Sequence, residues 1–304
     1  MSVITVSHLT KDYGHGRGVF DISLEVEKGV CYGFLGPNGA GKTTTIRHLM
    51  GFSKPQGGKT AILERDSWEN SAELKAKVGY LPGEISFPKG LTGMEFLRMQ
   101  MKMRRVRDSS KMNSLLKRFE LDPVMSVDRM SLGVRRKLAV VAAFIHDPDV
   151  LILDEPTSGL DPVMQQNFID FILEERACGK TILLSSHIFH EVDAACDRIS
   201  IIKDGRIAAD FAAEDLKNHG SKIYRITFGD RASFDRFTAL DYTFHSKNEK
   251  KLRARIMMET ADINRLLSDI SDLTVINFQE IAFTLEDFFM SFYKNDHAFE
   301  EVRK

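Results

Sequence analysis

The stretch GPNGAGKTT at residues 36–44 limits the folds open to this chain more than any other segment. It matches the pattern G-x-x-x-x-G-K-T, follows the apolar run VCYGFLG, and leads into a helical pattern that starts at about Lys42. Glycine lets backbone N–H groups approach phosphate oxygens closely, and the helix N-terminus adds the positive end of its dipole. The segment therefore predicts a phosphate-binding loop rather than a glycine-rich turn without a ligand.

Particular residues of this loop and of one later strand have predictable tasks. Lys42 should reach the terminal phosphates of a nucleotide, and the Thr43 hydroxyl should hold Mg²⁺. The apolar strand VLILDE ends in Asp154, which can bind Mg²⁺ through water, and in Glu155, which can polarise an attacking water. Asp154 taken alone could be an ordinary acid at the end of a strand. Beside the loop, it favours a site for a nucleoside triphosphate and Mg²⁺.

The remaining patterns predict an α/β fold. DVLILD (149–154) and TILLSS (181–186) are typical of buried strands, and each precedes a helical pattern, so we expect a parallel sheet. Alternating apolar residues before the loop predict further strands, which we place in an antiparallel β subdomain. Residues 86–147 are mostly helical in pattern and predict a helical subdomain. The segment RISIIKDGRIAAD predicts a hairpin.

The pattern changes after about Asp215, where a β-α-β-β-α-β order begins. We therefore expect two domains, a nucleotide-binding domain at 1–214 and a small α+β domain of the ferredoxin-like kind at 215–304. The second domain contains no second phosphate loop. The strands are expected at 222–228, 242–246, 251–258 and 273–280, and the helices at 231–240, 261–270 and 284–294.

Composition and cysteine spacing exclude several classes of protein. The 42 Lys and Arg against 43 Asp and Glu lack the basic excess of a dedicated nucleic-acid binder, so we expect no nucleic-acid partner. The three cysteines form no CxxC pair, which argues against a disulfide framework or a zinc site and favours a reducing cytosol. The chain starts without a signal-peptide pattern, and its longest apolar run, LAVVAAFI, is too short to span a membrane.

Five segments in a fixed order resemble the ABC ATPase family: GPNGAGKTT, YLPGE (80–84), MSLGVRR (130–136), LILDEPTSGLD (151–161) and SSH (185–187). They span nearly all of residues 1–210. The resemblance implies an ATPase that binds ATP and Mg²⁺ and closes head to tail with a second cassette around two nucleotides. The implied ATP contacts are Tyr13, Gly36, Asn38, Gly39, Ala40, Gly41, Lys42, Thr43, Thr44, Ser131 and Gly133.

The resemblance also gives roles to residues that could be purely structural. Ser131 and Gly133 would bind the γ-phosphate held by the opposite subunit, but Ser131 could simply cap a helix. Asp161 would lie in a loop at the dimer interface, although the pair Asp161-Pro162 is also a natural helix start. His187 would contact the γ-phosphate and the attacking water, or be a surface histidine. Tyr13 would stack on adenine, or pack at a strand end.

The chain departs from the family pattern at two sites. Leu132 and Val134 replace the first glycine and the final glutamine of the turn around Ser131, which we expect to keep its contact with ATP. Gly83 stands where the family normally has a glutamine that contacts Mg²⁺ and links to the membrane partner. Glu84 comes next and could approach the metal, since a carboxylate is a good ligand for a hard cation, or remain a solvated loop acid.

Within the family, the chain is most similar to cassettes of ABC-2-type exporters, which also end in a helix like TLEDFFMSFY (284–293). This implies a peripheral ATPase at the cytoplasmic face of a bacterial membrane that drives export through separately encoded permease subunits. An ABC ATPase acting on ribosomes or DNA is the alternative. It is disfavoured by the single phosphate loop and the absence of a long heptad tract in the sequence. A GTPase is disfavoured because no N-K-x-D motif follows the loop.

Overall fold

The computed structural model describes residues 1–217, 221–259, 262–281 and 284–294 of the chain. The chain divides into two compact units, Met1–Ala213 and Glu214–Lys304. The first unit contains two sheets and a group of helices, and the second contains one further sheet.

One sheet of the first unit is antiparallel, in agreement with the predicted antiparallel β subdomain, and has the strand order β2-β1-β4-β5. Burial alternates along β2, because one face of the strand packs on the core and the other faces solvent. The glycine-rich strand β4 and the short β5 were not predicted from the sequence. The strands are β1 (Ser2–Asp12), β2 (Gly18–Glu27), β4 (Gly57–Ile62) and β5 (Arg65–Asp66).

The other sheet of the first unit has the order β10-β9-β3-β8-β7-β6 and is parallel except for β10. This confirms the predicted parallel sheet. Every residue of β3 and β7 is buried, as expected for strands covered on both faces. The predicted hairpin joins β9 to β10 through Asp204 and Gly205, both at positive φ. The strands are β3 (Cys31–Leu35), β6 (Val78–Leu81), β7 (Val150–Asp154), β8 (Thr181–Ser186), β9 (Arg198–Lys203) and β10 (Arg206–Ala212).

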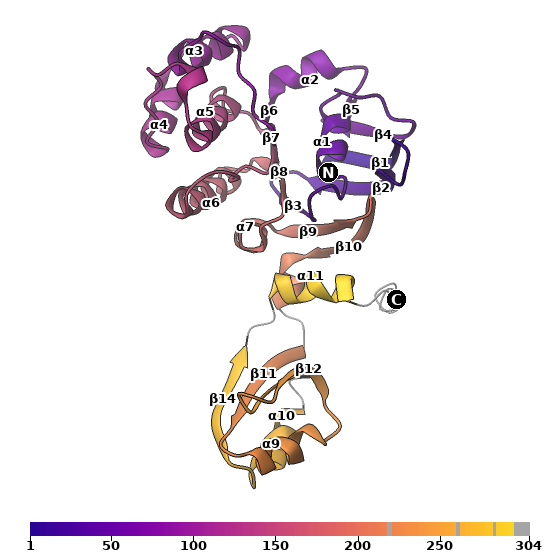
Figure 1. Ribbon diagram of the computed structural model, residues 1–304. Coiled ribbons are helices and arrows are strands. Elements are labelled where there is room, and N and C mark those ends of the chain that lie inside the picture. The colour runs from indigo at the N-terminus through magenta and orange to yellow at the C-terminus, as the bar shows by residue number, and fades with distance from the viewer. Residues whose placement is uncertain (218–220, 260–261, 282–283, 295–304) are drawn as a thin grey trace. The chain divides into compact units, whose positions relative to one another are not determined.

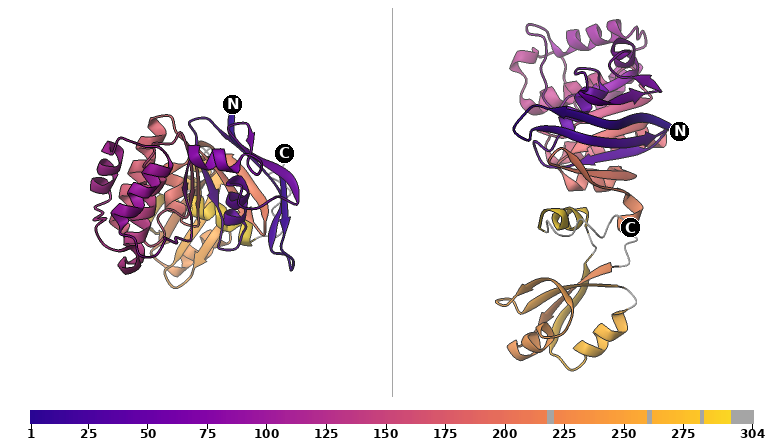
Figure 2. Two further views of the ribbon diagram at one scale, coloured as in Figure 1. Left: turned by 90° about the horizontal axis from the view of Figure 1, so that it is seen from above. Right: turned by 90° about the vertical axis from the view of Figure 1, so that its right-hand side faces the viewer.

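The helices α3, α4 and α5 gather at one end of the first unit, away from β1 and β2 (Figures 1 and 2). They lie within the segment predicted to be a helical subdomain. The helix expected from about His187 begins slightly later, at Phe189. The helices of this unit are α1 (Lys42–Leu49), α2 (Ser71–Lys77), α3 (Gly93–Met103), α4 (Ser110–Arg118), η1 (Val127–Arg129), α5 (Leu132–Phe144), α6 (Pro162–Ala177) and α7 (Phe189–Ala195). The short helix α8 (Ala213–Lys217) follows them at the unit boundary.

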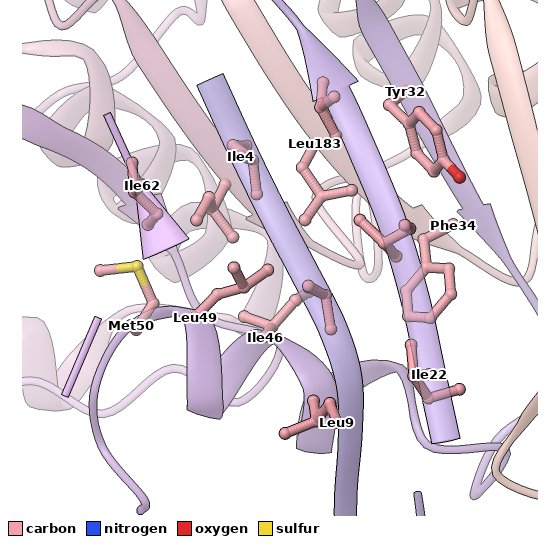
Figure 3. Packing of buried hydrophobic residues seen from close by; sticks show 14 of the residues in the cluster. Ile4, Leu9, Ile22, Tyr32, Phe34, Ile46, Leu49, Met50, Ile62 and Leu183 are labelled. Atoms are coloured by element: carbon pink, nitrogen blue, oxygen red, sulfur yellow. The ribbon is translucent and has the colours of Figure 1, made fainter. Parts of the chain in front are cut away.

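A continuous hydrophobic core joins the two sheets through helix α1. Ile46 and Leu49 of α1 pack between Ile4 of the antiparallel sheet and Leu183 of the parallel sheet (Figure 3). All four side chains are fully buried. Since burying such a side chain stabilises a protein by about 1.5–3 kcal/mol, this packing holds the N-terminus of α1 firmly in place. The phosphate-binding loop ends at that N-terminus.

The second unit has its elements in the predicted β-α-β-β-α-β order, followed by a helix. Its antiparallel sheet has the strand order β12-β13-β11-β14 and packs around its own apolar cluster, which includes Ile226, Phe237 and Ile256. Classification of this unit as ferredoxin-like stays a prediction. The elements are β11 (Ser221–Phe228), α9 (Arg231–Thr238), β12 (Thr243–Asn248), β13 (Arg253–Glu259), α10 (Ile263–Ile270), β14 (Val275–Ile281) and α11 (Leu285–Lys294).

Candidate functional site

The loop between β3 and α1 needs glycine at two positions. A Cβ on Gly36 would lie 2.5 Å from the carbonyl oxygen of Ile202, so no larger residue fits there. Gly41 has φ 114° and is the N-cap of α1, which has no side-chain cap. The first N–H groups of α1 are therefore free of a local side-chain acceptor at the N-cap and can bind an anion such as a phosphate.

Lys42 is 5% exposed and is held by three oxygens. Its ammonium donates hydrogen bonds to the carbonyl oxygens of Gly36, at 2.6 Å, and of Pro37, at 3.2 Å. It also lies 3.0 Å from Oε1 of Glu155. These contacts fold the loop around the ammonium group and leave a buried cation beside the N-terminus of α1, where an anionic ligand is stabilised.

Asp154 is completely buried and accepts two hydroxyl hydrogen bonds. Its Oδ2 accepts from Oγ1 of Thr43 at 2.8 Å, and its Oδ1 accepts from Oγ of Ser185 at 2.5 Å. A carboxylate and a hydroxyl are the hard oxygen donors that Mg²⁺ prefers. Within the described residues no group of three or more His, Cys, Asp or Glu could hold a metal by itself. That suits Mg²⁺, which usually binds one or two protein oxygens together with phosphates and water.

Glu155 follows directly and sits between two basic side chains. Its Oε2 is 2.5 Å from Nδ1 of His187, while Oε1 faces Lys42. The histidine tautomer that carries its proton on Nδ1 can donate to this carboxylate oxygen. Glu155 has φ 50°, an unusual value for a residue other than glycine, and its N–H donates to the carbonyl oxygen of Ser185 at 3.0 Å. This backbone conformation and this hydrogen bond fix the direction in which the Glu155 side chain leaves the backbone.

A cavity of about 670 Å³ is lined by Thr43, Asp154, Glu155 and His187, and Lys42 is connected to it through Glu155. A larger cavity of about 790 Å³, lined from β1, β2, β9 and β10, contains none of them, so chemistry rather than volume identifies the site. Glu84 lines the cavity but is exposed, and its approach to a metal stays a prediction. The lining residues are Asn38, Thr43, Arg47, Phe52, Tyr80, Pro82, Gly83, Glu84, Asp154, Glu155, Ser158 and His187.

The residues expected to act on a partner's nucleotide lie elsewhere. Among the described residues that line this cavity, neither Ser131 nor Gly133 is present. The exposed Ser131 caps α5, with its Oγ accepting from the N–H of Val134 at 3.4 Å. Asp161 caps α6, with its Oδ1 accepting from the N–H of Met164 at 3.0 Å. Both residues therefore have the structural role that the sequence left open, and their roles across an interface stay predictions.

Four further predicted contacts are Tyr13, Gly39, Ala40 and Thr44. Tyr13 is 56% exposed, and Nζ of Lys11 lies over one face of its ring, 5.6 Å from the ring centroid. Ala40 is buried beneath the loop, and Gly39 has φ 83°. Thr44, in the first turn of α1, is half-buried.

Sequence reasoning missed three buried polar residues around the site. Ser185 contacts Asp154 as described, Glu191 accepts from Oγ of Ser186 at 2.7 Å, and Arg136 bonds to three backbone carbonyl groups. Ser185 lies in SSH and Arg136 in MSLGVRR, both of which were recognised as motifs. Only their hydrogen-bond partners, which lie far away in the sequence, show what these residues do.

In the part of the chain that the structure describes, no helix combines the length and apolarity needed to cross a membrane.

Fold and site together define a P-loop ATPase of the ATP-binding-cassette type, with a glycine loop before α1, a buried aspartate at the end of β7 and an adjacent glutamate. The family description "ABC transporter" matches residues 19–158. The bacitracin transport ATP-binding protein BcrA of Bacillus licheniformis is 30% identical over 299 residues, covering 95% of this chain and 96% of that protein. The chain therefore belongs to the family of ABC transporter ATP-binding proteins and is an ATPase.

Two other proteins bear on this assignment. The Nod factor export ATP-binding protein I of Cupriavidus pinatubonensis is 34% identical over 220 residues, covering 71% of this chain and 68% of that protein. A solved structure of the cassette MJ0796, described as dimeric, in a post-hydrolysis state and bound to ADP and Pi, matches with a TM-score of 0.63. It covers 69% of this chain and 98% of that chain at 20% identity, and so supports the fold alone.

Proposed function

We propose that this chain is the ATP-hydrolysing subunit of an exporter. In the proposed cycle two cassettes close head to tail around two ATP molecules and drive a separately encoded membrane permease from its cytoplasmic face. The observation that carries the proposal is that Thr43, Asp154, Glu155 and His187 line one cavity, while Ser131 and Gly133 lie outside its lining. Lys42 is not a lining residue, but its ammonium lies 3.0 Å from Oε1 of Glu155. Each protomer would therefore supply the Ser131 turn, residues 130–134, to the nucleotide of the other.

In the proposed hydrolysis, the residues of the cavity and their neighbours have different roles. The α1 N-terminus and Lys42 would bind the phosphates, and the exposed Tyr13 would stack on adenine. Thr43 and Asp154 would hold Mg²⁺, which supplies charge neutralisation on the phosphate oxygens. The Glu155 carboxylate accepts a proton from water as the water oxygen bonds to the γ-phosphorus and the bond to the bridging oxygen of ADP breaks. His187, hydrogen-bonded to Glu155, keeps that carboxylate aimed at the water.

Support for export comes from the relatives and from the chain's C-terminus. One relative is named for bacitracin transport and matches almost the full length of both chains, and another is named for Nod factor export. The segment TLEDFF, which overlaps α11, resembles the end of exporter cassettes.

The central test is the Glu155→Gln variant in size-exclusion chromatography with Mg-ATP. Glutamine keeps the size of the side chain but cannot accept the proton, so ATP should persist and the variant should elute as a dimer. Lys42→Ala should lose ATP binding and remain a monomer. A Glu155→Gln protein that stays monomeric at every ATP concentration would refute the closed dimer.

Co-purification separates transport from the ribosome or DNA alternative. The tagged full-length chain, isolated from detergent-solubilised cells, should carry an integral membrane protein with it. Recovery of ribosomal RNA or DNA in place of a membrane protein would overturn the transport assignment.

A further inference from the structure

Arg136 is a charged side chain that lies almost wholly inside the first unit. It is 3% exposed, although arginine is among the residues least often buried. Its guanidinium donates three hydrogen bonds: Nη1 to the carbonyl oxygen of Pro82 at 3.0 Å, Nη2 to that of Gly83 at 2.8 Å, and Nε to that of Ser158 at 2.9 Å. One planar group thus joins two loops that are 75 residues apart in the sequence.

Both loops contact the acidic residues of the site, Asp154 and Glu155. A Cβ on Gly83 would lie 3.0 Å from Oδ2 of Asp154, the oxygen that also accepts from Thr43. The N–H of Ser158 donates to the carbonyl oxygen of Glu155 at 3.2 Å, closing the turn on which Glu155 sits. A shift of the Arg136 guanidinium would therefore move the neighbours of both acids.

Arg136 is also connected to Ser131 through the helix that contains it. Arg136 lies in α5, whose N-cap is Ser131, five residues earlier. The first turn of α5 also packs on the loop after Ser158. A Cβ on Gly133 would lie 3.0 Å from the carbonyl oxygen of Gly159, and one on Gly159 would lie 3.0 Å from the Leu132 side chain. Because α5 is a continuous helix of 13 residues, its N-terminus and Arg136 must move together.

The charge of Arg136 is buried but compensated. Burial lowers the pKa of Arg136, and the nearby charges of Asp154 and Glu155 act against that effect. Each of its three guanidinium nitrogens donates to a carbonyl oxygen, so the buried charge is hydrogen-bonded as buried charges must be. An apolar side chain could fill the same volume, but it could not hold three carbonyl groups in fixed positions.

We propose that Arg136 is a positioning residue that couples the Ser131 turn to Asp154 and Glu155 of the same protomer. Gly83 has no side chain with which its loop could be anchored, so the loop is held through its backbone by Arg136. Contact of Ser131 with a partner's nucleotide then sets the position of the two acids through α5. This inference rests on the proposed function, because it needs a partner's nucleotide at Ser131.

The test compares Arg136→Met, Arg136→Lys and the control Lys137→Met in the full-length chain. Methionine fills the space without donors, and lysine keeps the charge but cannot reach three carbonyl groups in one plane. Small misplacements of catalytic groups can cost about 100-fold in rate, so we expect kcat to fall at least about tenfold in Arg136→Met and less in Arg136→Lys. The affinity of the monomer for ATP should change less than about threefold, since Lys42 and the loop are untouched. Lys137→Met should behave as the unaltered protein.

A second readout does not depend on turnover. In the Glu155→Gln background, Arg136→Met should need at least about tenfold more Mg-ATP for dimer formation, while the affinity of the monomer for a fluorescent ATP analogue stays the same. Unchanged kcat and an unchanged Mg-ATP requirement in Arg136→Met would overturn the coupling. Parallel loss of ATP-analogue binding would also overturn it, because Arg136 would then support only the fold.

Two controls keep the result interpretable. If Arg136→Met is unfolded by circular dichroism, Arg136→Lys decides: native analogue binding together with full kcat and normal dimer formation refutes the inference. If Glu155→Gln alone fails to dimerise, the proposed function fails first. If Glu155→Gln dimerises and adding Arg136→Met changes nothing, only the coupling fails.

Discussion

Among single residues, Glu191 is a buried acid near Glu155. It is 2% exposed, and its Oε2 accepts from Oγ of Ser186, whose oxygen in turn accepts from the N–H of Ile188. Burial raises the pKa of Glu191 from 4.5 to about 7, and the charge of Glu155 adds to this, while the Ser186 hydroxyl works against it. The side chain therefore changes charge near neutral pH.

The sign of the resulting pH dependence follows from linkage. The folded state binds the Glu191 proton more tightly than the unfolded state does, so this residue's contribution to stability is complete below about pH 4.5 and is lost as pH rises through about 7. Between pH 5 and pH 8 the loss should be on the order of 2 kcal/mol. Glu191→Gln should remove that part of the pH dependence of unfolding in urea, and the exposed Glu69→Gln should not. If the free energy of unfolding changed with pH to the same extent in Glu191→Gln and in the unaltered protein, this account would be contradicted.

Among the elements, α3 and α4 begin in different ways. Thr92 caps α3 in a capping box: its Oγ1 accepts from the N–H of Glu95 at 3.2 Å, and the Glu95 carboxylate accepts from the N–H of Thr92 at 2.8 Å. Ser109 is the N-cap of α4 but makes no side-chain capping bond. Similar residue types at equivalent positions thus have different hydrogen-bonding roles.

The two caps give a matched pair of substitutions. Thr92→Ala leaves N–H groups of α3 without an acceptor and should lower the free energy of unfolding by about 1 kcal/mol. Ser109→Ala removes no capping bond and should change it by less than about 0.5 kcal/mol. Chemical denaturation of both variants measures the difference. An equal loss in the two would show that the Thr92 capping box does not stabilise α3.

At the scale of the whole molecule, each unit has its own core. The cluster around α1 contains residues of the first unit only, and the cluster around Phe237 contains residues of the second unit only. Phe237 is fully buried and its ring centroid is 5.2 Å from that of Phe228. Since apolar contacts stabilise mainly the core that contains them, damage to one cluster should remain in its unit.

Phe237→Ala tests this independence. The substitution should cost the second unit about 3–5 kcal/mol and make it sensitive to proteolysis, while affinity for ATP stays within about twofold of normal. Phe168→Ala, at an equally buried site of the first unit, is the reciprocal control and should reduce ATP binding. Loss of ATP binding in Phe237→Ala would show that the nucleotide site depends on the second core.

Prediction from sequence succeeded where the signal is local. The loop at 36–44, the strands that become β7 and β8, and the hairpin at Asp204-Gly205 each contain their pattern within about ten residues. Segment 57–77 was missed, because β4 starts with two glycines and α2 buries only Leu74. Several predicted boundaries in the second unit differ from the structure by one or two residues, as is usual where helix and strand ends fray.

The sequence alone determined the glycine loop before a helix and the carboxylates after an apolar strand, because these are short-range features. Phosphate and metal binding by these residues stays a prediction. Only the tertiary structure decided which groups meet. Parallel pairing of β7 with β8 and of β8 with β3 brings Asp154 to Ser185 and places Glu155 between Lys42 and His187. It also decided that Arg136 bonds to the carbonyl groups of Gly83 and Ser158, since contacts between distant segments depend on how the elements pack and not on any local pattern.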